Sequence, residues 1–240
     1  MIPKIIHYCW FGETPLPEKA QKCVASWKKY CPDYEIREWN ESNVDFSKCP
    51  QYVQDAYHAK KFAFASDYIR LKVLYENGGF YMDTDVELIK SLDQFLTDNA
   101  VIGFENDDFV NSGQMLAAEA GHPILSEMME RYNTVSFYRS DGSMYLLGCP
   151  HVNTDVLAEY GLKKDGNEQN IADVHVYPAD YFNPLDSVTG MLHKTENTVS
   201  IHWYAMSWKP PVLQLRVRIL RRIRKSLAKV GLYTSVKKGL

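Results

Sequence analysis

Short apolar runs alternate with segments of helical periodicity along most of the chain. Runs bounded by turn-forming residues, a pattern typical of β-strands, occupy residues 4–10, 34–39, 80–88, 100–106, 174–182 and 198–208. Apolar spacings of three and four predict helices within residues 14–30, 61–77, 123–133 and 151–161, with a short further element at 111–118. Strands that alternate with helices favour an α/β fold around a mostly parallel central sheet.

The clearest predicted helix covers residues 61–77. Its apolar residues repeat at helical spacing, among them Phe62, Ala65, Ile69 and Val73. Gly78 and Gly79 follow its last turn and end it as a helix C-cap does. No repeat, low-complexity stretch or long linker interrupts the chain before the basic C-terminal part. We therefore expect one domain over residues 1–208, followed by a tail over residues 209–240.

The tail differs in composition from the rest of the chain. Residues 209–240 hold ten Lys and Arg and no acid, whereas residues 1–208 hold 17 basic and 30 acidic residues, a net charge of −13. One side of a helix predicted over residues 213–232 collects the apolar side chains of Leu215, Ile219, Leu220, Ile223 and Leu227. Such a basic amphipathic helix suits an anionic membrane surface, so we expect residues 214–232 to bind one.

The alternative for the tail is a helix that packs on the acidic body of the same protein. Nucleic acid is not an expected partner, because the body offers no basic groove. The five cysteines are an odd number without a CxxC spacing, which favours a reducing compartment. The N-terminal apolar run is short and broken by His7, so neither a signal peptide nor a membrane span is expected. We expect a cytoplasmic protein, peripheral on the inner face of the cell membrane.

Two aspartates end the apolar run that follows the long helix. In "GGFYMDTDVEL", residues 78–88, Asp83 and Asp85 flank Thr84, so a continuous strand would point both carboxylates to one face. Like charges side by side repel, and a divalent cation is the obvious compensation. Carboxylates often hold Mg²⁺ or Mn²⁺ beside phosphate groups, and ligands of α/β sheets gather at strand carboxyl ends. The motif therefore predicts a site for a metal and a phosphorylated substrate.

Three stretches resemble, in this order, the sugar-binding DxD glycosyltransferases of family 32: "IPKIIHYCWFG", "FASDYIRLKVLYENGGFYMDTDVEL" and "IHWYAMSW". That family includes bacterial capsular and polysaccharide transferases and yeast initiating mannosyltransferases, and it is similar to the glucosylating clostridial toxins. The resemblance covers residues 2–208. It implies a single GT-A type domain, a Rossmann-like α/β fold for nucleotide-diphospho-sugars, and transfer with retention of anomeric configuration.

The resemblance also implies metal and nucleotide contacts. Asp83 and Asp85 match the motif that contacts the metal, the diphosphate and the ribose, with Thr84 beside them. His202 matches a C-terminal metal ligand, with a structural histidine in a strand as the alternative. Ser207 and Trp208 match a closing element that touches the diphosphate. This element orders over the donor and thereby excludes water.

Contacts to the donor sugar and base follow in the same way. Asp67 and Arg70 match residues that hydrogen-bond sugar hydroxyls, with an i,i+3 ion pair on one helix as the alternative. Trp10 matches an aromatic that stacks on the donor base, with core packing as the alternative. Asn111 matches the turn that lines the sugar and acceptor side. Small side chains that let the donor approach the helix are expected at Ala63 and Ser66.

The implied reaction moves a hexose from a nucleotide sugar to a glycan acceptor in bacterial cell-surface polysaccharide synthesis. A UDP-hexose is favoured over GDP-mannose as the donor, Mn²⁺ or Mg²⁺ is the expected metal, and the tail suggests an acceptor on a lipid carrier. Two alternatives stay open: a haloacid-dehalogenase-type phosphohydrolase, and a non-catalytic binding protein of the same fold. No role follows for Asp180, and an acidic cluster is interpreted as a solvated turn, namely Glu105, Asp107 and Asp108.

Overall fold

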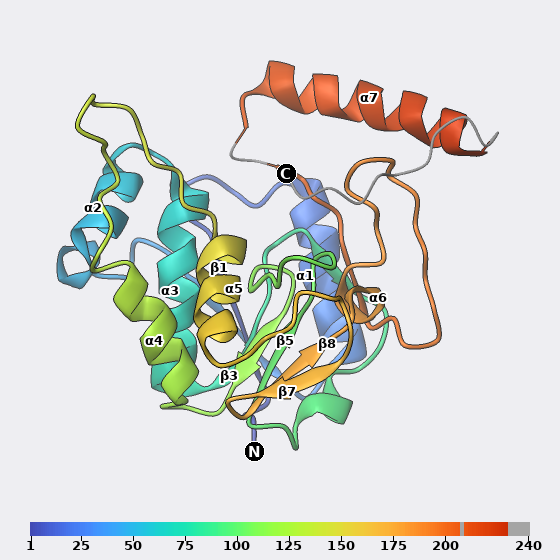
Figure 1. The fold of residues 1–240 in the computed structure, drawn as a ribbon, viewed down its shortest axis with the longest axis horizontal. Coiled ribbons are helices and arrows are strands. Elements are labelled where there is room, and N and C mark those ends of the chain that lie inside the picture. The colour runs from blue at the N-terminus through green and yellow to red at the C-terminus, as the bar shows by residue number, and fades with distance from the viewer. Residues whose placement is uncertain (207–208, 230–240) are drawn as a thin grey trace.

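The computed structural model describes residues 1–206 and 209–229. The helices are α1 (Glu18–Tyr30), α2 (Gln51–His58), α3 (Phe62–Asn77), α4 (Pro123–Arg131), α5 (Cys149–Glu159), α6 (Ala179–Phe182) and α7 (Pro211–Lys229). The strands are β1 (Ile5–Cys9), β2 (Glu35–Trp39), β3 (Gly79–Tyr81), β4 (Val86–Leu88), β5 (Ala100–Gly103), β6 (Leu116–Ala118), β7 (Gln169–Ile171), β8 (Val174–Tyr177) and β9 (Ser200–His202). Figure 1 shows the sheet between helices, with α7 apart from it.

The central sheet has seven strands in the order β2-β1-β3-β6-β5-β8-β7. β1 pairs in parallel with β2 and β3, and β5 pairs in parallel with β8, whereas β6 and β7 run against their neighbours. Five of the seven strands therefore share one direction, which confirms the predicted α/β fold with a mostly parallel sheet. The carboxyl ends of these strands meet at one edge, where α/β folds bind ligands.

Both faces of the sheet are buried because side chains alternate along each strand. Ile6 and Phe80 pack with Trp27 of α1 on one face. Tyr81 and Ile102 point to the other face, in the cluster to which α2, α3, α4 and α5 contribute. Figure 1 shows α3, α4 and α5 together on the side opposite α1. The two clusters hold the carboxyl edge of the sheet in place.

The prediction of one continuous strand over residues 80–88 is wrong. The chain forms β3 and β4 there, and the N–H of Val86 donates to the carbonyl oxygen of Asp83 at 3.0 Å to close a turn between them. β3 belongs to the central sheet, whereas β4 pairs antiparallel with β9 in a separate two-stranded sheet. The two aspartates therefore converge through a turn and not through the alternation of a pleated strand.

Two later predicted strands are shorter than expected. The run over residues 174–182 gives β8, after which Pro178 leads into the one-turn helix α6. The run over residues 198–208 gives only β9, and residues 207–208 lie outside the described part of the chain. The sequence patterns did not indicate α2 or the edge strand β7.

α7 begins three residues after the predicted domain boundary at residue 208 and matches the helix expected in the tail. In Figure 1 it crosses above the body, on the side away from the N-terminus. The division of the chain at residue 208 stays a prediction, and residues 230–232 of the predicted helix lie outside the described residues. No helix in the described ranges has the length and apolar character that crossing a membrane requires.

Candidate active site

Asp83 follows β3 directly and is held from three sides. Its N–H donates to the carbonyl oxygen of Gly113 at 2.8 Å. Its Oδ1 accepts from the Tyr81 hydroxyl at 3.0 Å and from Nη2 of Arg70 at 3.1 Å. Its Oδ2 faces Gly113, where a β-carbon would come within 2.4 Å of it. Burial raises the pKa of the Asp83 carboxyl above its usual range, although the Arg70 charge opposes this.

Asp85 lies in the turn and faces β9. Its Oδ1 lies 3.3 Å from Nε2 of His202, and its Oδ2 accepts from the N–H of Ala205 at 2.6 Å. Its carbonyl oxygen accepts from the N–H of Trp203 at 3.0 Å. Burial favours the neutral carboxyl, but the imidazole and the hydrogen bonds outweigh it, so the pKa of Asp85 lies below its usual range.

His202 reaches the aspartates because β9 pairs with β4, which places Val86 opposite His202. The imidazole is buried, and among the described residues its Nδ1 has no hydrogen-bond partner. Burial lowers the pKa of His202, but the Asp85 carboxylate more than offsets this and raises it. The imidazole thus faces Asp85 through Nε2, and its unpartnered Nδ1 is suited to a partner that the protein itself does not supply.

Asp83, Asp85 and His202 form one group of candidate metal ligands. One ligand atom from each lies within 4.8 Å of the others. Two carboxylates and an imidazole suit a divalent cation such as Mn²⁺, and the orphaned Nδ1 agrees with this. The three residues predicted to hold a metal thus lie together, and they fit such an ion.

Arg70 is buried and connects Asp67 to Asp83. Its Nη2 lies 2.9 Å from Oδ1 of Asp67 and 3.1 Å from Oδ1 of Asp83. Its Nη1 donates to Sγ of Cys149 at 3.0 Å, and its guanidinium lies over the Tyr81 ring, 4.8 Å from the centroid. These protein partners engage most of the guanidinium fork. Arg70 forms the alternative ion pair and fixes the orientation of Asp83, while its contact with a sugar stays a prediction.

Asp67 lies in the second turn of α3 beside the start of α5. Its Oδ2 accepts from the N–H of Cys149 at 3.1 Å, and burial raises the pKa of Asp67 to about 6. The preceding residue is Ser66, whose hydroxyl donates to the carbonyl oxygen of Ala63 at 2.7 Å and accepts from Arg70. Small side chains therefore line the helix next to the buried carboxylate. Their contact with a donor stays a prediction.

Asn111 is buried, and both ends of its amide are engaged. Its Oδ1 accepts from the N–H of Gly113 at 2.7 Å, and its Nδ2 donates to Oε2 of Glu105 at 3.2 Å. Oε1 of Glu105 accepts from the hydroxyl of Tyr204 at 3.1 Å, and the ring centroid of Tyr204 lies 4.2 Å from that of His202. The interpretation of Glu105 as part of a solvated turn is therefore wrong, because Glu105 connects Asn111 to the segment after β9.

The remaining residues singled out from the sequence have the following contacts and exposures. Trp10 is half-buried at the end of β1, where its Nε1 donates to the carbonyl oxygen of Thr14 at 2.5 Å. Thr84 is half-buried in the turn between the two aspartates. Asp180 accepts from the Thr195 hydroxyl at 2.7 Å and fastens a loop. The described residues do not include two others, Ser207 and Trp208.

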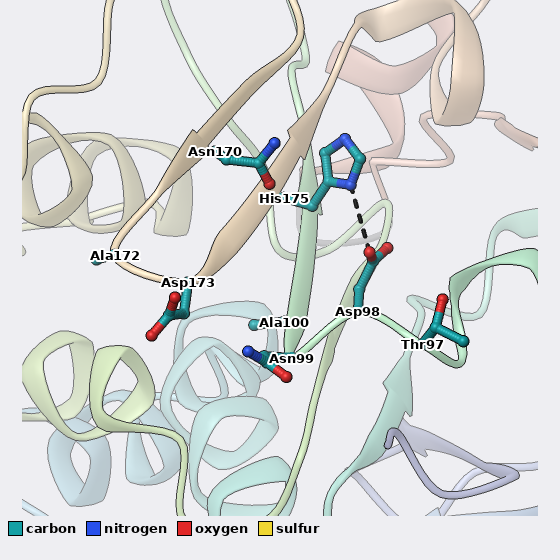
Figure 2. A pocket seen from close by; sticks show the side chains of 8 residues that line it. All are labelled: Thr97, Asp98, Asn99, Ala100, Asn170, Ala172, Asp173 and His175. Atoms are coloured by element: carbon teal, nitrogen blue, oxygen red, sulfur yellow. Dashed lines mark hydrogen bonds and ion pairs between the residues drawn. The ribbon is translucent and has the colours of Figure 1, made fainter.

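A separate hollow of about 430 Å³ opens at the opposite edge of the sheet (Figure 2). It lies at the amino ends of β5 and β8, where Nδ1 of His175 is 3.4 Å from Oδ1 of Asp98. Its lining consists of Thr97, Asp98, Asn99, Ala100, Asn170, Ala172, Asp173 and His175. Because the carboxylate cluster lies at the carboxyl ends of the strands, this hollow is not part of the candidate active site.

Comparisons with known proteins agree with the carboxylate cluster. Residues 17–102, which include Asp67, Arg70, Asp83 and Asp85, match the family described as the glycosyltransferase sugar-binding region containing DXD motif. Residues 17–102 thus correspond to the sugar-binding region of DXD-type glycosyltransferases. The matched region ends within β5, so it covers both aspartates of the motif and the buried Asp67–Arg70 pair.

Two proteins of Schizosaccharomyces pombe are similar to this chain. Inositol phosphoceramide mannosyltransferase 3 is 30% identical over 143 residues, which is 57% of this chain and 38% of that protein. Inositol phosphoceramide mannosyltransferase 1 is 26% identical over 253 residues, which is 95% of this chain and 77% of that protein. The chain thus spans well under half of the first relative and about three quarters of the second.

A solved structure shows the same fold. The PaToxG glycosyltransferase aligns with a TM-score of 0.52 at 20% identity, over 66% of this chain and 69% of that one. This agreement, together with the sheet order, confirms that the chain has a GT-A type α/β fold. At this identity the likeness concerns the fold alone.

Proposed function

We propose that this protein transfers a hexose from a nucleoside diphosphate sugar to a glycan acceptor, with retention of anomeric configuration. One observation carries the proposal: Asp83 and Asp85 of the DXD turn and His202 of β9 converge at the carboxyl edge of the sheet. A bound divalent cation would supply positive charge to the diphosphate that departs with the nucleotide. Mn²⁺ is our preferred ion, because an imidazole stands beside the carboxylates.

The protein's own groups would orient the donor. Arg70 holds Oδ1 of Asp83, while Oδ2 lies against Gly113. Asp67, which pairs with Arg70, and Asn111, which accepts from Gly113, lie close to Asp83 and would hydrogen-bond sugar hydroxyls. Their partners inside the protein fix both side chains before any donor arrives, which lowers the entropic cost of binding.

Retention requires either a covalent intermediate or attack on the face from which the leaving group departs. Two carboxylates next to the cluster are engaged, Asp67 by Arg70 and the N–H of Cys149, and Glu105 by Asn111 and Tyr204. These contacts lower the nucleophilicity of both carboxylates, which supports same-face attack with the leaving phosphate as the base. Isolation of a covalent glycosyl-enzyme on the reaction path would contradict this mechanism.

We also propose the donor, the acceptor and the place in the cell. A UDP-hexose is our preferred donor, and both yeast relatives are named mannosyltransferases, so GDP-mannose is the donor to test against it. The acceptor would be a glycan on a lipid carrier during synthesis of a bacterial cell-surface polysaccharide. That setting suits α7, whose outward side chains include the exposed Val212, Leu215, Ile219 and Ile223. The enzyme would then work on the inner face of the cell membrane.

The decisive experiment measures nucleoside diphosphate released from a panel of nucleotide sugars with Mn²⁺, with and without a chelator. We expect one donor to be cleaved, with the activity abolished by the chelator. Asp85→Ala should lower the rate by on the order of 100-fold, whereas Asp155→Ala, an exposed carboxylate on α5, should leave it unchanged. Release of inorganic phosphate would indicate the phosphohydrolase alternative. Absence of both cleavage and calorimetric binding across the panel would indicate a non-catalytic protein.

A further inference from the structure

A hollow of about 380 Å³ lies between α7 and the body of the protein. Three cationic side chains line it, those of Lys61, Lys209 and Arg216. The rest of its lining is apolar and consists of Leu146, Pro210, Leu213, Val217 and Leu220. None of these eight residues is acidic, although residues 1–208 carry a net charge of −13. The hollow therefore combines positive charge and hydrocarbon on a protein whose body is acidic.

The hollow is built from the same segments as the candidate active site. Lys61 immediately precedes α3, the helix that carries Asp67 and Arg70. Leu146 precedes Cys149, whose N–H holds the Asp67 carboxylate. On the third side, Lys209 follows the segment in which Ala205 donates to Asp85. A molecule in the hollow is thus held by segments that also position the sugar-binding and metal-binding groups.

Two segments that line the hollow also carry exposed apolar side chains. The loop between α4 and α5 exposes Tyr138, Met144 and Leu146 by 43%, 42% and 40%. α7 exposes Leu215 and Ile219 by 55% and 49%. This loop and α7 both rise on the side of the molecule away from the N-terminus in Figure 1.

We propose that the hollow binds the phosphate-bearing end of a lipid-linked acceptor. Lys61, Lys209 and Arg216 supply the charge for the phosphate, and the apolar lining takes the first carbons of the lipid chain. A free phosphate would use only the cations and a plain hydrocarbon only the apolar wall, whereas a lipid phosphate uses both. The inference rests on the proposed function, since it names the class of acceptor that such a transferase takes.

Calorimetry with the whole chain and farnesyl phosphate, below its micelle concentration, tests the inference. We expect farnesyl phosphate to bind at least about tenfold more tightly than farnesol, inorganic phosphate or dihexanoyl phosphatidylglycerol. The double variant Lys61→Ala with Arg216→Ala should lose about tenfold in affinity. The matched pair Arg222→Ala with Lys225→Ala removes two exposed cations of α7 outside the hollow and should bind as the wild type does. Equal melting temperatures would verify the folding of both variants.

Three outcomes would overturn the inference: an equal loss in the matched pair, inorganic phosphate binding as tightly as farnesyl phosphate, or equal binding of the phospholipid. Metal-dependent donor cleavage without acceptor, measured on the same proteins, separates this inference from the proposed function. Cleavage should persist in the Lys61→Ala, Arg216→Ala variant. If the wild type cleaves a donor but does not bind farnesyl phosphate, the inference alone is wrong. If the wild type binds farnesyl phosphate but cleaves no donor, the proposed function is wrong and the site is a lipid-phosphate site of another protein class.

Discussion

The hydrogen bonds of the buried His7 ring require its neutral form. Its side chain is fully buried in β1, where Nδ1 lies 3.0 Å from Nε1 of Trp39 and Nε2 lies 2.9 Å from the carbonyl oxygen of Gly78. An indole nitrogen only donates and a carbonyl only accepts, so the neutral ring carries its proton on Nε2. Burial lowers the pKa of His7 to about 4, from an ordinary value of 6.5.

This histidine should make the protein sensitive to acid. Above pH 6.5 the ring is neutral in both states. Between about pH 6.5 and 4 the unfolded chain binds a proton that folded His7 does not. The free energy of unfolding therefore decreases as the pH is lowered, by up to about 3 kcal/mol. Urea unfolding at a series of pH values should show this fall in the wild type and a smaller one in His7→Gln. The exposed His58→Gln serves as control, and parallel curves for wild type and His7→Gln would refute the assignment.

At the scale of elements, the site depends on how closely two loops approach. The loop after β5 brings Gly113 against the turn between β3 and β4, where the N–H of Asp83 donates to its carbonyl oxygen. Gly113 has no left-handed backbone conformation, so the need for glycine is one of space. A β-carbon would lie 2.4 Å from Oδ2 of Asp83 and 3.1 Å from Nη1 of Arg70.

Gly113→Ala should therefore displace the Asp83 carboxylate while the fold is kept. We expect weaker Mn²⁺ binding in a calorimetric titration and a rate of donor cleavage lower by on the order of 100-fold. Gly148→Ala is the matched control, because the nearest atom to its added β-carbon lies 3.5 Å away. Wild-type Mn²⁺ affinity in Gly113→Ala would show that this approach does not position Asp83.

Elements with local signals were predictable from the sequence, and elements set by distant pairing were not. α3 covers residues 62–77 against a prediction of 61–77, because helical spacing and the two following glycines are local features. The break at Asp83 depends on β4 pairing with a strand that contains His202, more than 100 residues later. The DxD motif indicated Asp83 and Asp85, and the family resemblance indicated His202. Glu105 and Tyr204, in contrast, meet across 99 positions that no spacing could relate.

For the molecule as a whole, α7 contacts the body with one side and exposes apolar side chains on the other. One side faces the body, where Nε of Arg221 donates to the carbonyl oxygen of Ser187 at 2.7 Å. The other side presents Leu215, Ile219 and Ile223 at exposures of 55%, 49% and 51%, among basic residues. A helix that served only to pack on the body would turn these apolar residues inward, so the arrangement supports a membrane-facing role.

Replacing this outward stripe should weaken membrane binding without affecting donor cleavage. In co-sedimentation with vesicles that contain anionic lipid, Leu215→Glu with Ile219→Glu and Ile223→Glu should reduce partitioning by at least about tenfold. A control adds the same charge elsewhere on the surface, through Gln21→Glu, Asn133→Glu and Asn167→Glu. Binding of the wild type should fall with added salt. An equal loss in the control, or equal binding to neutral vesicles, would show that α7 is not the membrane contact.

The contacts of Arg221 have a thermodynamic consequence. Its guanidinium lies 5.6 Å from the ring centroid of Tyr204, and that ring lies against His202, so three side chains join α7 to the candidate metal ligands. If a bilayer displaces Arg221 and so changes the affinity of the site for its cation, then cation binding must change the affinity for the bilayer by the same factor, because linkage is reciprocal. Loading of the donor site would then alter how long the enzyme resides on the membrane.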